Sequence, residues 1–130
     1  MSNQTDSETL PPLIDAGSAT EIIELLGRPR YLELLRKLVD QAQEKTALIA
    51  RETLQKRELD VQEHLHSLKG PASSLFAARL AQKIESLEHN EQLPSALELA
   101  SLRDCARQTL RAFVEANSEP AHSLTGSVAS

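Results

Sequence analysis

Apolar residues recur at steps of three and four positions along this chain, from about position 18 to position 117. This spacing places them on one face of an α-helix. The first stretch, "ATEIIELL", is short; Ser18 and Glu21 predict a capping box at its start, and Gly27 is suited to end it. Pro29 then fits the first turn of a longer helix. The pattern predicts a short helix followed directly by a long one.

Four amphipathic stretches make up the rest of this region, and Asp60 with Glu63 predicts a second capping box at the start of the second stretch. Short connections make neighbouring helices antiparallel. We therefore expect an all-α fold, an antiparallel up-and-down four-helix bundle with a short additional N-terminal helix. The predicted inward residues of the four stretches are Tyr31, Leu34, Leu35, Leu38, Ala42 and Ile49, then Val61, Leu65, Leu68, Ala72 and Leu75, then Phe76, Leu80, Ile84 and Leu87, and finally Leu99, Leu102, Ala106, Leu110 and Phe113.

The two ends of the chain lack this pattern. Residues 1–17 are polar and contain proline, and residues 118–130 are small, polar and without periodicity. We expect a flexible N-terminal segment over 1–17, one helical domain over 18–117 and a flexible tail over 118–130.

Composition narrows the possible functions. The net charge of −5 argues against a general nucleic-acid binder, which needs a basic surface. Four glycines are too few for a loop that wraps nucleotide phosphates, so we expect no ATP site and no kinase activity. The single Cys105 leaves no disulfide within the chain and suits a reducing compartment. No apolar run approaches membrane-spanning length and nothing resembles a signal peptide, so we expect a cytoplasmic protein that does not bind membranes.

The stretch "EHLHSLKGPASSLFAARL" carries the candidate chemistry, because it interrupts a helical pattern with glycine and proline. If the apolar residues of this helix point inward, the helical step of about 100° gathers a different set on the outward side. An exposed imidazole with an ammonium one turn away is suited to carry a phosphoryl group, and a glycine there permits close approach of a partner. A solvated surface histidine is the alternative reading. The outward set is Gln62, His66, Lys69, Gly70 and Ser73.

The other polar candidates have ordinary explanations. His64 lies about 200° around the helix from His66, so the two cannot share a metal ion, and we expect no metal site. His89 falls at a helix end and His122 in the tail. Cys105 is expected to be a small, partly buried filler, and Ser73 with Ser74 to be small residues that serve access and packing and are not nucleophiles. The carboxylates of "EIIELL" and "ESLEHN" are typical of a solvated helix face.

"HSLKG", followed by "ASSL" and later by "IESLE", resembles the histidine-containing phosphotransfer (HPt) family, whose hallmark is His-x-Leu-Lys-Gly, then small residues, Leu-Gly-Ala and a final Leu-Glu. The resemblance covers the chain from about Ile22 to Ala116. It implies that His66 accepts a phosphoryl group from the aspartate of one receiver domain and passes it to another, assisted by Lys69 and Gly70. It also implies receiver domains or a hybrid sensor histidine kinase as partners, with Mg²⁺ supplied by the receiver, and a monomeric carrier with no cofactor of its own.

Two residues depart from the family pattern. Phe76 stands where the family usually has the glycine that closes the histidine helix, and phenylalanine does not readily adopt left-handed geometry. Pro71 cannot donate to the carbonyl of Ser67 and should bend the helix. These departures keep open a second hypothesis, a helical docking module that binds a receiver domain or an enzyme without carrying phosphate. A third is a helical subunit that dimerises through its apolar stripe.

Overall fold

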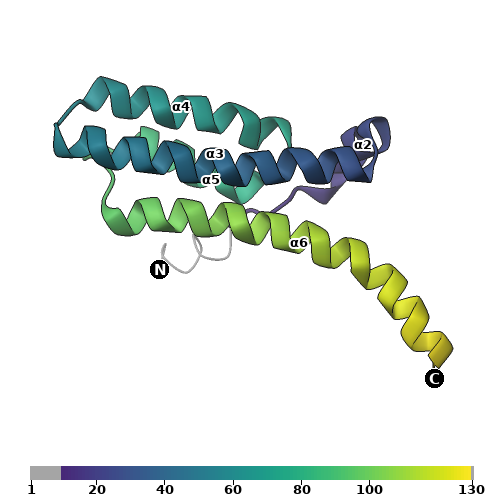
Figure 1. Ribbon diagram of the computed structural model, residues 1–130. Helices are drawn as coiled ribbons and strands as arrows, with labels where there is room; N and C mark the ends of the chain where they lie inside the picture. Colours follow the sequence, from purple (N-terminus) through teal and green to yellow (C-terminus); the bar gives the residue numbers. More distant parts are fainter. Residues whose placement is uncertain (1–9, 130) are drawn as a thin grey trace, which may run out of the picture.

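The computed structural model describes residues 10–129, with side chains described as far as Ala116. Figure 1 shows the path of the chain through its helices. The described residues contain no strand, which confirms the all-α class. No helix among them is both long enough and apolar enough to cross a membrane. The helices are α2 (Ala16–Leu26), α3 (Arg28–Leu54), α4 (Glu58–Ser74), α5 (Ala78–Glu88) and α6 (Ala96–Ala129).

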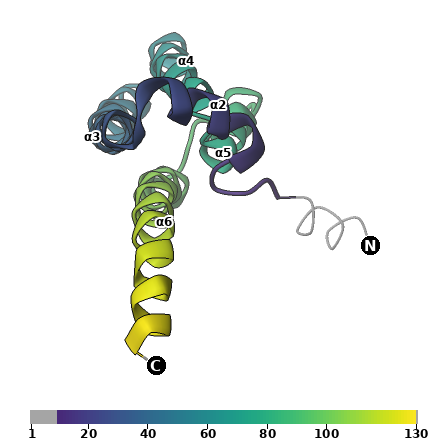
Figure 2. The ribbon, with the colours of Figure 1, turned by 90° about the vertical axis from the view of Figure 1, so that its right-hand side faces the viewer.

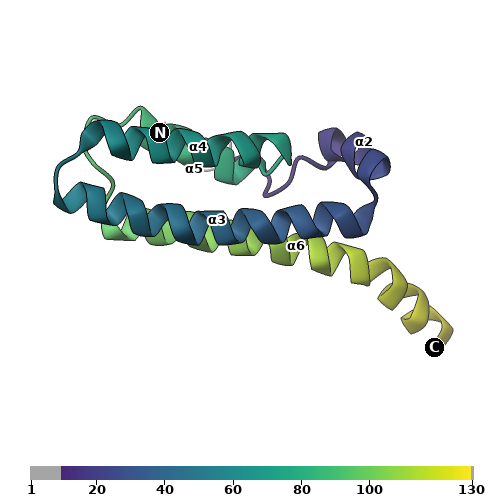
Figure 3. The same cartoon turned by 45° about the horizontal axis from the view of Figure 1, so that its top comes forward.

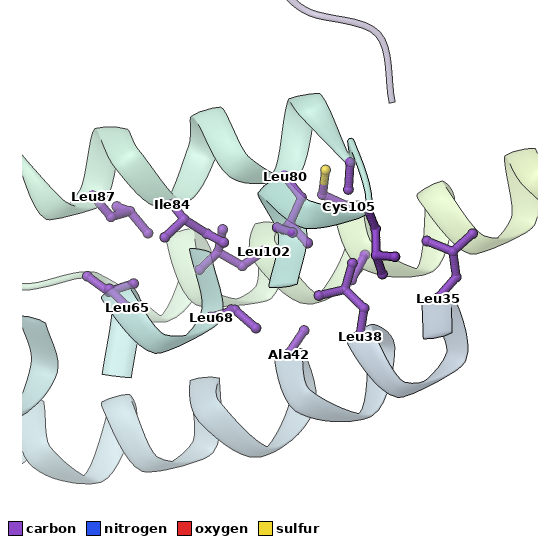
Figure 4. Close-up of a cluster of buried hydrophobic side chains, with 14 of the residues drawn as sticks. Leu35, Leu38, Ala42, Leu65, Leu68, Leu80, Ile84, Leu87, Leu102 and Cys105 are labelled. Carbon is purple, nitrogen blue, oxygen red and sulfur yellow. The ribbon is translucent and has the colours of Figure 1, made fainter. Parts of the chain in front are cut away.

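Four helices share one hydrophobic core. α3 contacts both α4 and α6, α4 contacts α5, and α5 contacts α6. Figure 3 shows α3 and α6 along one side of the structure, with α4 and α5 along the other. The predicted inward positions form this core, except that Leu34, Phe76 and Leu110 are only partly buried. Ten of the core residues are labelled in Figure 4, which shows leucines of α4 and α5 facing those of α3 and α6. The apolar pattern therefore identified the core correctly.

The short helix α2 lies across one end of the other helices (Figure 2) and contacts α3. Gly27 ends α2 with φ of 91°, in a region that favours glycine, and its N–H donates to the carbonyl of Ile23 at 2.7 Å. Pro29 stands in the first turn of α3. Both expectations for this junction are confirmed.

Both predicted capping boxes are wrong. α2 begins at Ala16, and its cap is Asp15, whose carboxylate accepts from the Ser18 N–H at 3.3 Å. α4 begins at Glu58 after Arg57, which makes no side-chain cap, so Asp60 already lies in the first turn. Each of these helices starts about one turn or less before the expected position, because an S/T/D-x-x-E pattern does not by itself fix where the first turn forms.

The structure contains a capping box that the sequence reading missed. The Ser95 hydroxyl accepts from the Glu98 N–H at 3.1 Å, and the Glu98 carboxylate accepts from the Ser95 N–H at 2.9 Å. Together these bonds satisfy two backbone donors at the start of α6, directly after Pro94. The signal was present in the sequence as Ser-x-x-Glu.

Two tight corners end α3 and α4, and each has a non-glycine residue in the left-handed conformation: Lys56 with φ of 58° and Phe76 with φ of 59°. At the second corner the Ala77 N–H donates to the Ala72 carbonyl at 2.9 Å and the Phe76 N–H donates to the Ser73 carbonyl at 3.0 Å. This is the Schellman hydrogen-bond pattern. Phe76 thus adopts the geometry that we expected it to resist, and α4 ends at Ser74, where a glycine cap would end it.

Contacts from distant parts of the chain hold the Phe76 corner. The Tyr31 hydroxyl donates to the carbonyl of Leu75, and the Phe76 carbonyl accepts from the Asp15 N–H at 2.9 Å. Just beyond, the Arg79 N–H donates to the carbonyl of Pro12 at 3.0 Å. The left-handed conformation of Phe76 costs free energy on the order of 1 kcal/mol, and these tertiary contacts offset it.

The structure at the two ends of the chain can be compared with the expected domain boundaries. Residues 1–9 of the expected flexible segment 1–17 lie outside the described residues, whereas Leu13 and Ile14 pack against the core, which the sequence reading did not predict. At the other end α6 runs to Ala129, past the other helices (Figure 1), so the expected boundary at 117 falls inside it. Flexibility of residues 118–130 stays a prediction.

Candidate functional site

The exposed face of α4 carries His66. Val61, Leu65, Leu68 and Ala72 are 1% exposed or less, so the same helix faces the core on its other side. The helical repeat then directs His66 outward, and 78% of its side chain is accessible. The imidazole is held at the surface because the apolar repeat of α4 leaves its position out of the core.

Glu88, the last residue of α5, connects His66 to Lys69. One carboxylate oxygen lies 3.3 Å from His66 Nδ1 and the other lies 3.3 Å from Lys69 Nζ. The Glu88 side chain is only 12% exposed, and that of Lys69 is 29% exposed. A single carboxylate therefore joins the ring to the ammonium across the α4–α5 contact, in a setting partly shielded from water.

This geometry distinguishes the two nitrogens of His66. An ionised carboxylate can only accept hydrogen bonds, so Nδ1 must donate to Glu88. In the neutral ring the proton then resides on Nδ1 and the lone pair on Nε2. The nitrogen with nucleophilic character is Nε2.

Gly70 lies one turn after His66 on the exposed face, as expected. Apart from its two chain neighbours and the backbone of its own helix, a Cβ built at this position meets no atom within 4 Å. Packing against the other helices thus gives no reason for a glycine here, although glycine costs a helix about 1 kcal/mol relative to alanine. A local reason is Pro71, because the ring of a proline disfavours the helical conformation of a preceding residue that has a Cβ. Pro71 follows inside α4, which continues to Ser74. A bend at this proline stays a prediction.

The two remaining expected site residues flank His66 on α4. Gln62 is half-buried one turn before His66, and Ser73 is exposed two turns after it. Leu59, seven residues before His66, shares its face and is 85% exposed. The sequence reading did not include Leu59, because a leucine in an amphipathic repeat is ordinarily assigned to the core.

The remaining histidines and the cysteine were not expected to belong to the site. His64 is half-buried, and His89 caps the end of α5, where its Nδ1 donates to the Glu85 carbonyl at 2.9 Å. His122 lies outside the described side chains. Burial raises the pKa of the Cys105 thiol, against smaller opposing effects of Lys83 and Arg79. This buried thiol stays protonated and is a poor nucleophile.

Glu88 is the residue of the candidate site that the sequence analysis misassigned. We expected the carboxylates of "ESLEHN" to form a solvated face, but Glu88 is largely buried and bonded to both His66 and Lys69. Its signal was the final Leu-Glu of "IESLE", which we read as a family hallmark and not as a contact. Helical spacing could not reveal the contact, because it depends on how α5 packs against α4.

The part of the chain that the structure describes holds no group of three or more His, Cys, Asp or Glu side chains able to bind a metal ion. The chain matches no protein-family model, no curated protein and no solved structure.

Proposed function

We propose that this chain is a histidine phosphotransfer protein or domain. His66 would accept a phosphoryl group from the aspartyl phosphate of one receiver domain and pass it to the aspartate of another. The observation that carries the proposal is an imidazole 78% exposed and bonded through Nδ1 to a carboxylate that also holds Lys69. A histidine kept at the surface only for solubility would need no such partner.

The transfer requires little from the carrier. The lone pair on His66 Nε2 attacks phosphorus, the N–P bond forms, and the bond between phosphorus and the aspartyl oxygen breaks with its electron pair leaving on the receiver carboxylate. Lys69 offsets charge on the phosphoryl oxygens, and the missing side chain of Gly70 lets the receiver approach. Gln62 and Ser73 would contact the receiver on either side of the ring. Mg²⁺ and the acidic pocket belong to the receiver, and this chain supplies no cofactor.

The proposal includes the finer architecture and setting. We place α3 to α6 in an antiparallel up-and-down four-helix bundle, because the connections 55–57 and 75–77 have only three residues each and such short connections favour antiparallel neighbours. The carrier would act as a monomer in the cytoplasm, where receiver domains reach the exposed face of α4.

The experiment is incubation of the purified chain with a receiver domain phosphorylated on its aspartate. We expect an acid-labile, alkali-stable phosphate on the chain, absent from His66→Gln. Lys69→Ala should still fold, judged by circular dichroism, and should be labelled more slowly. Labelling that persists in His66→Gln would refute the assignment of His66, and an unchanged rate in Lys69→Ala would remove the proposed role of Lys69.

One observation favours a second candidate, a docking module that binds a receiver or an enzyme without carrying phosphate. Leu59 exposes 85% of its surface on the same face of α4 as His66, as an apolar anchor for a partner would. Binding of a receiver that is unchanged by His66→Gln and reduced by Leu59→Ser, together with no phosphate transfer, would favour this candidate.

A further inference from the structure

A groove runs between α5 and α6, outside the candidate site. It consists of two hollows, of about 280 and about 380 Å³, and Leu10, Lys83 and Ser101 line both of them. Leu97 lines the larger hollow and is 82% exposed, so part of the apolar lining is open to water. Removing apolar surface from water is favourable, so a segment that covered this groove would be stabilised there.

The α5 side of the groove carries positive charge. Arg79 and Lys83 lie about one turn apart on α5, and among the described residues neither forms an ion pair with a carboxylate. Lys83 Nζ donates to the Ser101 hydroxyl at 3.1 Å, and Arg79 Nε donates to the carbonyl of Pro11 at 2.9 Å. Both acceptors are neutral, so they leave the two charges uncompensated.

The carboxylates on the α6 side of the groove already have donors. Glu98, in the smaller hollow, accepts from the Ser95 N–H at 2.9 Å. Asp104, in the larger hollow, accepts from Arg107 at 2.8 Å. The groove is therefore suited to an occupant that brings negative charge of its own.

The chain itself reaches this groove at Leu10. The residues that follow Leu10 are fixed beside α5 (Figure 2), because the Arg79 N–H donates to the carbonyl of Pro12 at 3.0 Å, and Leu13 and Ile14 pack against the core. Leu10 lines both hollows. Residues 1–9 are thus attached to the structure at the groove.

The sequence of residues 1–9, "MSNQTDSET", has the charge and spacing that the groove requires. It contains Asp6 and Glu8 but no lysine, arginine or histidine. Two residues of an extended chain span about 7 Å, close to the rise of about 6 Å over the four residues from Arg79 to Lys83. Glu8 is two residues and Asp6 four residues from Leu10, so both carboxylates can reach the two cations.

We propose that residues 1–9 of this chain occupy the groove between α5 and α6, with Asp6 and Glu8 paired with Arg79 and Lys83. The inference goes beyond the proposed phosphotransfer function and does not depend on His66. An attached segment has an effective concentration in the millimolar range, so weak ion pairs suffice to hold it. The segment covers the apolar lining and excludes acidic segments of other proteins from the groove.

The test uses Cys105, the single cysteine, which lines the larger hollow and is 2% exposed. Its alkylation by iodoacetamide, a neutral reagent, is followed by mass spectrometry in the full chain and in a chain that begins at Leu10. We expect a rate about threefold higher in the shortened chain, the effect of losing two exposed ion pairs. The two rates should converge in about 1 M sodium chloride, which screens such pairs.

The groove itself is left unaltered, because its cations act on the reporter. Burial raises the pKa of the Cys105 thiol, and Lys83 and Arg79 oppose this effect, so replacing either cation would change the thiol directly. Rates measured over a range of pH values separate the reactivity of the thiolate from its pKa.

The matched variants change charge without shortening the chain. Asp6→Asn combined with Glu8→Gln should react as fast as the shortened chain. Glu21→Gln combined with Glu24→Gln removes the same charge from the exposed surface of α2 and should react like the full chain. Circular dichroism should show that all these proteins fold alike, and the amide variants keep the test decisive if the shortened chain does not fold.

Three results would overturn the inference. The first is equal rates in the full chain and in Asp6→Asn with Glu8→Gln. The second is a rate that rises on shortening alone, because the contact would then not depend on the two carboxylates. The third is a rate that falls with increasing protein concentration, which would show that a second copy of the chain fills the groove. None of these results bears on His66 as a phosphoryl carrier, which the receiver experiment tests separately.

Discussion

The two faces of α4 are built on opposite principles. On one face Leu65 and Leu68 are fully buried in the core that α4 shares with α3, α5 and α6 (Figure 4). On the other face, His66 is open to solvent, and a Cβ added at Gly70 would meet no atom of another helix. The buried face supplies the free energy that holds the helix in place, and the exposed face contributes little to it. The difference shows that two adjacent residues can be under separate constraints: Leu65 is constrained by packing in the core, whereas His66 is free to serve the chemistry of the exposed face.

The largest expected effect comes from the buried face. Leu68→Ala should lower the free energy of unfolding by about 2 to 5 kcal/mol, because it removes a fully enclosed side chain and leaves a cavity. His66→Gln, two positions away, should change it by less than about 0.5 kcal/mol. Urea titrations followed by circular dichroism measure both. Similar losses from the two variants would contradict the division of α4 into a stabilising and a chemical face.

The next effect concerns the Tyr31 hydroxyl, which holds the end of the buried face through the Leu75 carbonyl. Tyr31→Phe should cost about 1 to 2 kcal/mol at neutral pH, because it leaves that carbonyl unpaired. Burial raises the pKa of Tyr31 to about 12, above its ordinary value of 10.0. The contribution of the neutral hydroxyl is thus complete below pH 10 and is lost as the pH rises from 10 to about 12.

The measurement is the free energy of unfolding of both proteins at a series of pH values from 8 to 12. The unaltered chain should lose stability more steeply above pH 10 than Tyr31→Phe does. Cys105, whose pKa burial also raises, contributes equally to both proteins and cancels in the difference. Parallel curves through this window would show that the hydroxyl is not buried as the structure has it.

The smallest expected effect on stability belongs to the exposed face. Gly70→Ala should change the free energy of unfolding by less than about 1 kcal/mol, because the preference of alanine for helix is opposed by crowding of its methyl group against the ring of Pro71. Under the proposed function the same methyl group should slow phosphoryl transfer from a receiver. Rates from a phosphorylated receiver, compared with rates from the small reagent phosphoramidate, separate obstruction of a partner from damage to His66. A folded Gly70→Ala protein with both rates unaltered would leave the glycine without the role proposed for it.

Much of the fold could be read from the spacing of apolar residues. Val61, Leu65, Leu68 and Ala72 were expected to point inward and do so, and the same spacing placed His66 outside. Local signals at helix starts were less reliable: Ser18 and Asp60 were taken for caps, whereas Asp15 caps α2 and the true capping box joins Ser95 to Glu98. Short polar motifs occur by chance at a helix start and inside its first turn alike, so they locate a boundary only to within a turn.

By itself the sequence determined which side of each helix is buried and that an imidazole, an ammonium and a glycine share one exposed helix face, because these follow from the helical repeat. Only the tertiary structure decided that Glu88 joins His66 to Lys69 and that Phe76 turns the chain in a left-handed conformation. The physical reason is the same for both. A contact between α4 and α5 and a strained corner held by Tyr31 and Asp15 depend on residues far apart in the chain, and no local periodicity records where those residues meet.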